Sequence, residues 1–473
     1  MIAILSVLSR SLLSTTTTNP CAEFAIGDGP QITKGIPQPG WTTAQLDTWW
    51  TKMKACRTFQ LQSVQYNGTA FKNPDLDWTQ RAFAIPMVQA YDRFLYDEQT
   101  KTYTVDRLVD DLETRYGGAD AVFLWPTYTN IGMDNRNQLD LFRAMPGGIK
   151  ALNDIASAFH KRGVHVMWGY NPWDTGTERE PHWMSVTDDA LNVITALKAA
   201  AGDGFNMDTM GHTPPEWPAA AKLLNYTVAY QAEGGGSVAT MEYETMNTCH
   251  CSYTKGVQSV DHYKFLDARR MTSVRDRWGL DHTSAFQHAF FNGVGFETTE
   301  NDWGQCNIMT YKNAETYKRI NTILRRFLDG GLLTSQEWRP HVPGVLTTTQ
   351  HVFASTFPST TLRTEQAWLF VNRGDVDVHG AQIRLLASIA GAKTSSFYDC
   401  WRGTPLAVDP KTSTVSFTMP ANGYGCVVRS ANSSTAGSGA FATFLARMRE
   451  LYAVVFFIEV TEEKKQIKTG CTP

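Results

Sequence analysis

The chain of 473 residues has little of several features that define whole classes of protein. Its net charge is −3 and its lysines and arginines are scattered, so no basic stripe indicates a nucleic-acid partner. The apolar run at residues 451–460 is too short to span a bilayer. Eight cysteines allow a few disulfides but are too few to be the scaffold of the fold.

Several catalytic motifs are also missing. No G-x-S-x-G sequence occurs, which argues against a serine hydrolase of the nucleophile-elbow type. There is no P-loop and no glycine-rich dinucleotide fingerprint, so no nucleotide cofactor is expected. The run Cys249-His250-Cys251 lacks a second pair of ligands at a suitable spacing, so we expect a disulfide that involves one of these cysteines and no metal.

The N-terminus favours the secretory pathway over a cytosolic location. Residues 1–19 resemble a signal peptide, although Arg10 interrupts the apolar region and no clear cleavage site follows. Tripeptides of the form N-x-[ST] begin at Asn67, Asn225 and Asn432. We therefore expect a secreted glycoprotein with disulfide bonds.

From about residue 82 the chain alternates between short apolar runs and amphipathic helical segments. Helical periodicity is clearest at 105–116 and 313–328. Eight strands alternating with helices predict a (β/α)8 TIM barrel over residues 81–345. A doubly wound open sheet is the main competitor, but it would more often carry a glycine-rich loop after the first strand. The expected strands are 84–91, 121–125, 164–170, 204–210, 238–242, 271–276, 293–297 and 332–335.

Different patterns flank this region. Residues 20–80 are expected to form an extension packed on the barrel, with a capped helix at 41–59 that places Trp49, Met53 and Cys56 on one face. Short alternating runs with turn residues between them predict a small antiparallel β-sandwich over 346–430. Residues 431–473 are a linker and a tail, which is either a docked helix or strand or an unstructured appendage.

Several apolar runs end in an acidic residue, which is the pattern of a barrel whose strand ends line one mouth. The stretch GFNMDTM at 204–210 is the clearest, with Asp208 at its far end. The simpler interpretation makes Asp208 an N-cap for the next helix. Tryptophans follow several of the same strands, and acids among aromatic rings suit a carbohydrate.

Cleavage of a glycosidic bond needs two carboxyl groups in different protonation states. We expect Asp208 on strand four to be the nucleophile and Asp276 on strand six to be the acid/base. Glu297 on strand seven could replace either. The simpler alternative for Asp276 is an ion pair with a neighbouring arginine. Residues expected to contact the sugar are Asp92, Trp125, Trp168, Asn171, Trp173, Asp174, Glu242, Arg275 and Trp303.

Long motifs in the chain resemble a poorly characterised TIM-barrel family of the glycoside-hydrolase superfamily. The motifs lie at 103–148, 170–177 (YNPWDTGT), 203–211 (DGFNMDTMG), 290–304 (FFNGVGFETTENDWG) and 421–428 (ANGYGCVV). Members of this family are often fused to a formylglycine-generating domain; none is expected here, so a sulfatase-activating function is not carried over. Acids on strands four and six look like those of the α-galactosidase-type retaining clan, an analogy between folds.

These observations lead to two hypotheses of function. The first is a glycoside hydrolase with a retaining two-carboxylate mechanism, a carbohydrate substrate and no cofactor. Its two carboxyl groups should lie about 5–5.5 Å apart for retention, or about 6.5–9.5 Å apart for inversion. The second is a non-catalytic carbohydrate-binding protein with an aromatic cleft. The oligomeric state is not indicated by the sequence.

Overall fold

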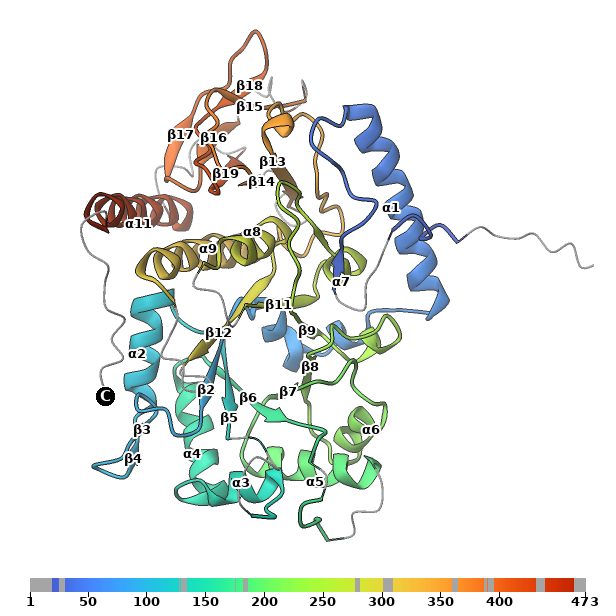
Figure 1. Cartoon of the computed structure of the whole chain (residues 1–473), viewed down its shortest axis with the longest axis vertical. Helices are drawn as coiled ribbons and strands as arrows, with labels where there is room; N and C mark the ends of the chain where they lie inside the picture. Colours follow the sequence, from blue (N-terminus) through green and yellow to red (C-terminus); the bar gives the residue numbers. More distant parts are fainter. Residues whose placement is uncertain are drawn as a thin grey trace, which may run out of the picture.

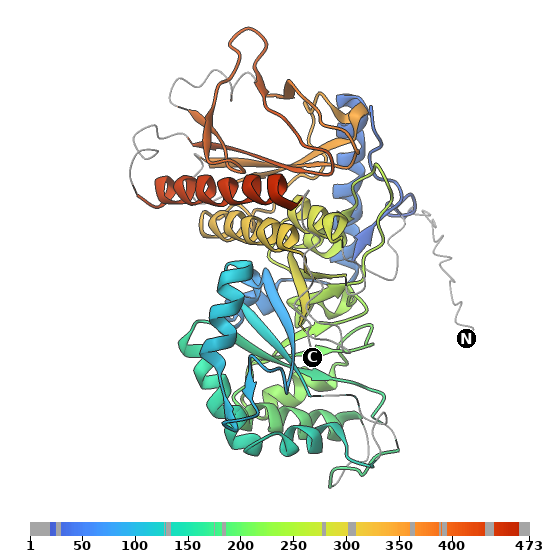
Figure 2. The ribbon, with the colours of Figure 1, turned by 60° about the vertical axis from the view of Figure 1, so that its left-hand side comes forward.

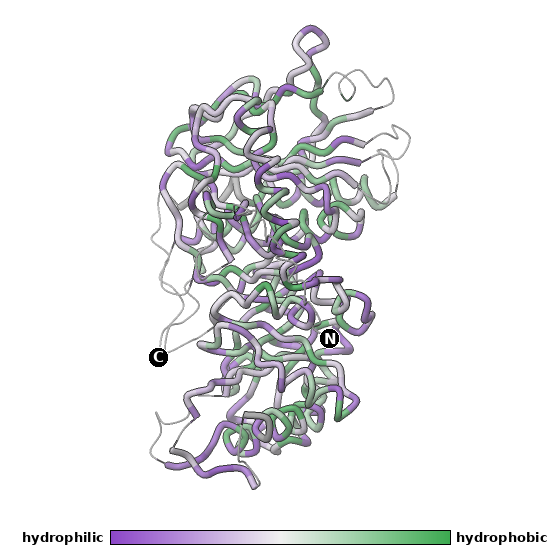
Figure 3. The backbone as a smooth tube through the Cα atoms, turned by 90° about the vertical axis from the view of Figure 1, so that its right-hand side faces the viewer, coloured by the Kyte–Doolittle hydropathy of each residue, from purple (hydrophilic) through white to green (hydrophobic). Residues whose placement is uncertain are grey.

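The computed structural model describes most of the chain. The described residues are 19–24, 30–126, 128, 134–174, 176–181, 186–276, 281–300, 309–359, 365–386, 389, 395–430 and 439–462. Residues 1–18 of the expected signal peptide lie outside them, as does Trp303. Hydrophobic and hydrophilic residues are interspersed along the backbone (Figure 3). No helix in the described ranges is long and apolar enough to cross a membrane.

Eight parallel strands close into a barrel, which confirms the predicted fold class (Figure 1). Helices follow most of the strands and form the outer wall. In barrel order the strands are β2 (Ala84–Gln89), β5 (Ala121–Trp125), β6 (His165–Tyr170), β7 (Gly204–Met207), β8 (Ala229–Ala232), β9 (Met246–Cys249), β11 (Met271–Arg275) and β12 (Gly295–Glu300).

The outer helices form where their apolar residues recur with helical spacing. In α2 (Val105–Tyr116), Leu108 and Leu112 belong to one buried stripe, and the helix ends at Gly117, whose φ of 75° is the left-handed conformation that glycine adopts easily. The other helices around the barrel are α3 (Gln138–Ala144), α4 (Gly148–Lys161), α5 (Val186–Ala199), α6 (Glu216–Leu223), α7 (His262–Leu266), α8 (Thr283–Asn292) and α9 (Tyr311–Asp329).

Two of the predicted strands were wrong, and the count of strands after β7 changes. Residues 238–242 are not strand five; they contain the 3-10 helix η3 (Ala239–Glu242). Strand five is β8, strand six is β9, and the run at 271–276 therefore supplies strand seven. The run at 293–297 supplies strand eight, and 332–335 forms no strand. β8 and β9 are four residues long and carry polar Gln231, Asn247 and Thr248, so neither looks like an apolar run.

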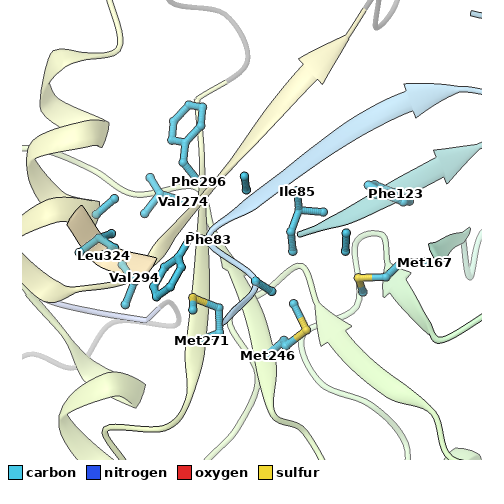
Figure 4. Close-up of a cluster of buried hydrophobic side chains, with 14 of the residues drawn as sticks. Phe83, Ile85, Phe123, Met167, Met246, Met271, Val274, Val294, Phe296 and Leu324 are labelled. Atoms are coloured by element: carbon cyan, nitrogen blue, oxygen red, sulfur yellow. The ribbon is translucent and has the colours of Figure 1, made fainter. Parts of the chain in front are cut away.

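The interior of the barrel has an apolar layer below a polar one. Ile85, Phe123, Met167, Met246 and Met271 are buried and belong to one core cluster (Figure 4). Above them, polar side chains bond across neighbouring strands. Alternate residues of a strand face the same side, so side chains two positions beyond an inward-facing residue also point into the barrel.

In the polar layer, Asn206 Nδ2 donates to Gln231 Oε1 at 2.8 Å, and Gln231 Nε2 donates to Ser273 Oγ at 2.9 Å. All three side chains are fully buried. Two residues further along each strand the chain reaches Asp208, Glu233 and Arg275, so the same periodicity directs these side chains inward at the carboxyl ends of the strands.

Antiparallel sheets follow the barrel, as predicted. One has five strands in the order β13 (Val352–Pro358), β14 (Glu365–Asn372), β19 (Tyr424–Ser430), β16 (Ser396–Asp399) and β17 (Thr404–Leu406). The other pairs β15 (Ala381–Arg384) with β18 (Thr414–Ser416). A disulfide joins Cys400 to Cys426. The sheets lie across α8 and α9 from the barrel (Figure 2), and Gln287 of α8 donates to the Asn372 carbonyl at 2.7 Å.

Both ends of the described chain pack on this body. Helix α1 (Thr43–Ser63) has Thr42 as N-cap in a capping box with Gln45 and buries Trp49, Met53 and Cys56, as the sequence predicted. A Cys21–Cys56 disulfide ties the preceding segment to it, and β1 (Gln31–Ile32) pairs with β10 (Val260–Asp261). The tail forms α11 (Ala440–Glu462), which packs beside α9. The predicted domain boundaries themselves stay a prediction.

Candidate active site

Asp208 lies at the carboxyl end of β7 and is held there on two sides. Its backbone N–H donates to the Tyr170 carbonyl at 2.8 Å, which continues the β6–β7 ladder by one residue. Its side chain is nearly buried, and Asn171 Nδ2 donates to Oδ2 at 2.5 Å. Asn171 is fixed in turn by Gln138, whose Oε1 accepts from the Asn171 backbone N–H at 2.9 Å. Asn171 is therefore a positioning residue for the Asp208 carboxyl group.

Glu233, the first residue after β8, is the immediate partner of Asp208, and a hydrogen bond joins the two carboxyl groups. Three further donors surround Glu233. Oε1 accepts from Arg275 Nη1 at 2.8 Å and lies 2.8 Å from His250 Nε2. Oε2 accepts from the backbone N–H of Thr209. Glu233 is thus the most heavily hydrogen-bonded carboxylate at this end of the barrel among those described.

Arg275 carries the positive charge of the site. It ends β11, is 4% exposed, and lies between two carboxylates. Nη1 contacts Glu233, and Nη2 lies 2.5 Å from Oε1 of Glu297, the residue opposite Arg275 in the β11–β12 register. One buried cation therefore neutralises part of the charge of Glu233 and Glu297.

The two carboxyl groups of the Asp208–Glu233 dyad titrate in opposite directions. Burial, followed by the hydrogen bond and charge of Glu233, raises the pKa of Asp208 to about 7. Burial alone would raise the pKa of Glu233 too, but the hydrogen bond from His250 and the charge of Arg275 lower it well below its usual range. Between these two pKa values the dyad holds one proton, located mainly on Asp208.

The sequence paired Asp208 with Asp276, and the structure does not bring these two together. Asp276 follows Arg275, and because alternate residues face opposite sides, the inward position of Arg275 directs Asp276 away from Glu233. Its Oδ2 lies 3.4 Å from His282 Nδ1 at the start of α8. No hydrogen bond or ion pair joins Asp208 to Asp276 within the described residues. Asp276 and Glu297 do line one small cavity.

Two of the predicted aromatic residues lie at the same end of the barrel as the dyad. Trp125 ends β5, is buried, and contacts the ring of Tyr128 at a centroid distance of 4.9 Å. Tyr128 lies nearly parallel to Trp173, with ring centroids 6.5 Å apart. Trp173 is 60% exposed, so much of its ring is open to solvent beside Asn171.

Trp168 and Glu242 are placed away from the mouth. Trp168 is buried on the outer face of β6, where it packs edge-on against Phe142 of α3, 4.7 Å between centroids. Glu242 precedes β9 and accepts from the backbone N–H of Asn67 at 2.9 Å, on the side of the amino ends of the strands. The structure therefore does not support a sugar contact for either residue.

Asp92 and Asp174 lie beyond the carboxyl ends of β2 and β6 but hold local structure. Asp92 Oδ1 accepts from the backbone N–H of Phe94 at 2.7 Å in the turn after β2. Asp174 Oδ2 accepts from the backbone N–H of Gln138 at the start of α3, and its Oδ1 accepts from Thr177 Oγ1. A direct role in sugar binding for either residue stays a prediction.

Sequence reasoning missed Glu233 and His250. Glu233 ends the run Ala229-Tyr230-Gln231-Ala232 and precedes three glycines, so it has the same strand-then-acid pattern that identified Asp208. His250 was considered only as a metal ligand. The expected disulfide is present between Cys249 and Cys251, and the residue between them contacts Glu233. The His250 side chain is 46% exposed, so solvent reaches this edge of the dyad.

Gly169 makes room for Trp125 inside the barrel. A Cβ at this position would lie 1.9 Å from Cε3 of Trp125. We expect Gly169→Ala to displace the indole and to lower the free energy of unfolding by about 1–3 kcal/mol, measured by urea denaturation with tryptophan fluorescence. Gly211→Ala, where nothing lies within 4 Å of the added Cβ, is the matched control. Equal stability of both variants would contradict this packing.

Comparisons with known proteins give only distant likenesses. No protein-family model matches the chain, and no curated protein matches it. An α-amylase from Geobacillus thermoleovorans, solved with acarbose, is 11% identical over 74% of this chain and 99% of its own, with a TM-score of 0.49. A β-L-arabinopyranosidase from Geobacillus stearothermophilus is 8% identical over 75% and 98%, with a TM-score of 0.46. The barrel assignment rests on the strand pairing of this chain.

Proposed function

We propose that the chain is a glycoside hydrolase that uses Asp208 and Glu233 as its two carboxyl groups. The observation that carries the proposal is the hydrogen-bonded pair of buried acids at the carboxyl ends of β7 and β8, whose pKa values are shifted in opposite directions. Glycosidic cleavage needs one carboxyl group ionised and the other protonated. The position also fits, because catalytic groups of TIM barrels lie at the carboxyl ends of the strands.

The contact between the two carboxyl groups favours retention of configuration. An inverting enzyme keeps its carboxyl groups about 6.5–9.5 Å apart to leave room for a water molecule. A hydrogen bond joins Asp208 and Glu233, so the two groups are closer than the about 5–5.5 Å of retaining enzymes and leave no room between them for the water of an inverting enzyme. The retaining mechanism expected from the sequence is therefore kept, with a different partner for Asp208.

The protonation states reverse the role expected for Asp208. Ionised Glu233 attacks the anomeric carbon, and Asp208 gives its proton to the leaving oxygen as the glycosidic bond breaks. Once Glu233 is a neutral ester, the negative charge that raised the pKa of Asp208 is gone. The Asp208 carboxylate can then take a proton from the water that attacks the anomeric carbon and releases Glu233.

The surroundings of the dyad provide candidate sugar contacts. The exposed ring of Trp173 and the neighbouring Tyr128 offer flat faces for the C–H side of a sugar. Asp276 is partly exposed, and we keep it as a candidate contact to substrate hydroxyls rather than as the acid/base. Trp303, outside the described residues, stays a predicted contact.

The proposal is tested with a panel of aryl glycosides that covers common sugars and both anomers. We expect wild type to hydrolyse at least one of them. For a substrate with a poor leaving group, Asp208→Asn should lose roughly 10²–10⁴-fold in kcat, because proton donation is removed. Glu242→Gln is the matched control and should lose far less, because Glu242 lies away from the dyad and contacts the Asn67 backbone. Sugar binding without turnover by wild type would instead favour the non-catalytic carbohydrate-binding alternative.

The pKa of Asp208 predicts the alkaline limb of the pH profile. Asp208 must be protonated to act as the acid, so kcat/KM should fall about tenfold per pH unit above a pKa near 7. Glu233 ionises below its ordinary value, so the acidic limb should lie below pH 4.5. The profile is measured from pH 3 to 9 on an activated substrate, for which Asp208→Asn retains enough rate. An unchanged alkaline limb in that variant would assign the limb to another group.

A further inference from the structure

Three potential metal ligands gather at the opposite end of the barrel from the dyad. His165 is the first residue of β6, Asp203 directly precedes β7, and His160 lies in the last turn of α4. The amino ends of parallel strands lie opposite the carboxyl ends that carry Asp208 and Glu233. This His160–His165–Asp203 cluster is therefore separate from the proposed active site.

The cluster has the spacing of a three-ligand site. One ligand atom from each residue lies within 4.8 Å of the other two. His160 Nε2 is 2.7 Å from Asp203 Oδ2, and His165 Nδ1 is 3.4 Å from the same oxygen. Shifts of at most about two ångströms would place all three atoms around one ion at bond lengths near 2 Å.

Neighbouring groups fix two of the ligands in place. The backbone N–H of Val166 donates to Asp203 Oδ2 at 2.7 Å, and Trp78 stacks on the His165 ring with centroids 4.3 Å apart. His165 Nδ1 is itself buried and has no hydrogen bond within the described chain. A buried ring nitrogen left without a hydrogen bond beside a carboxylate is an unused ligand atom.

The cluster opens on a cleft of about 840 Å³ lined by residues that include Trp78, His165, Asp203 and Tyr226. Water or a small ligand can therefore reach the position between the three side chains.

We propose that His160, His165 and Asp203 bind a divalent transition-metal ion of the Zn²⁺ type. Two imidazole nitrogens and one carboxylate oxygen suit Zn²⁺ and its neighbours, whereas Mg²⁺ and Ca²⁺ prefer oxygen ligands alone. The ion replaces the proton that His160 shares with Asp203, and the remaining position faces the cleft. Bound there, it ties the end of α4 to the first residues of β6 and β7.

The test is a titration of tag-free, chelator-treated protein with ZnCl₂, followed by calorimetry, and with CoCl₂, followed by visible absorption. Wild type should bind one equivalent at this site, show the visible bands of cobalt with nitrogen ligands, and gain several degrees in Tm at saturating Zn²⁺. His160→Gln and His165→Gln should each weaken binding at least tenfold. His379→Gln is the matched control, because His379 is exposed in the segment between β14 and β15, outside the cluster.

Two results would overturn the proposal. In the first, wild type binds Zn²⁺ no tighter than His160→Gln or His165→Gln, both shown by circular dichroism to be folded. In the second, His379→Gln loses as much affinity as they do. Aryl-glycoside turnover is read separately and should not change in any of the three variants, because none of them touches the Asp208–Glu233 dyad.

Discussion

Glu233→Gln is expected to lower kcat on the order of 10⁴-fold for any glycoside that wild type cleaves, the largest loss of activity for a single substitution in this chain. The amide keeps the size of the side chain and can still contact Arg275 and His250. It cannot attack the anomeric carbon, so the covalent step is lost. Since Asp208 is affected only indirectly, an activated leaving group should not restore the rate.

Added azide distinguishes the roles of the two dyad residues. In Glu233→Ala, azide can occupy the space of the missing carboxylate and attack the anomeric carbon, giving a glycosyl azide of inverted configuration. In Asp208→Ala, the glycosyl intermediate still forms from an activated substrate, and azide then gives the retained product. The product anomers are assigned by proton NMR.

Glu242→Gln is the matched control, because Glu242 is an acid of the same chain segment that contacts the Asn67 backbone away from the dyad. It should keep nearly full activity. If Glu233→Gln kept more than a tenth of the wild-type rate, Glu233 would not be the nucleophile. If the retained and inverted azide products were exchanged between the two alanine variants, Asp208 would be the nucleophile, as the sequence alone indicated.

The first half of the barrel could be predicted because its strands are apolar on both faces. β5 is Ala-Val-Phe-Leu-Trp, and the helix before it ends at a glycine, so both the element and its boundary were found from the sequence. β8 and β9 could not be found in this way. Gln231 of β8 belongs to a polar layer of hydrogen-bonded side chains, and β9 carries Asn247 and Thr248, so neither strand has the apolar signal that identifies a buried strand.

The missed strands explain most of the difference between the site predicted from the sequence and the dyad that the structure brings together. With 238–242 taken as strand five, Glu242 occupied the place that belongs to Glu233, and Asp276 was counted on strand six rather than seven. The orientation of each side chain was a second limit. Trp125 faces inward and Trp168 outward because of the register of β5 and β6, which pairs Leu124 with Trp168. A shift of one residue would exchange the two faces, and composition does not fix that choice.

The same alternation decided between Arg275 and Asp276. The sequence offered two adjacent charged residues at a strand end and left open which one faces the cavity. The structure directs the arginine inward, where two buried acids on β8 and β12 already require a cation. Burying two carboxylates without a cation would cost more free energy than burying one arginine with them. The charges on the neighbouring strands therefore determine that Arg275, and not Asp276, faces inward.

Arg275→Met is expected to cause the largest loss of stability. Methionine fills much of the volume but leaves Glu233 and Glu297 buried without their cation. Removing one member of a buried ion pair costs about 3–5 kcal/mol in the free energy of unfolding, because the remaining charge is left uncompensated. Arg447→Met is the control: Arg447 pairs with Glu450 at 3.1 Å and both side chains are largely exposed, so its loss should cost under about 1 kcal/mol.

The cost of Arg275→Met should depend on pH with a definite sign. Arg275 helps to lower the pKa of Glu233 from its ordinary 4.5. The stability that this pairing contributes is therefore fully present above pH 4.5 and is lost as the pH falls through the lower pKa of Glu233 in the folded state. The difference in the free energy of unfolding between wild type and Arg275→Met should therefore be larger at pH 7 than below pH 4.5, as measured by urea denaturation under the two conditions. Adding Glu297→Gln to Arg275→Met should recover part of the loss, since it removes one uncompensated charge. A cost at pH 7 no greater than that of Arg447→Met would show that Arg275, Glu233 and Glu297 are not coupled as the structure places them.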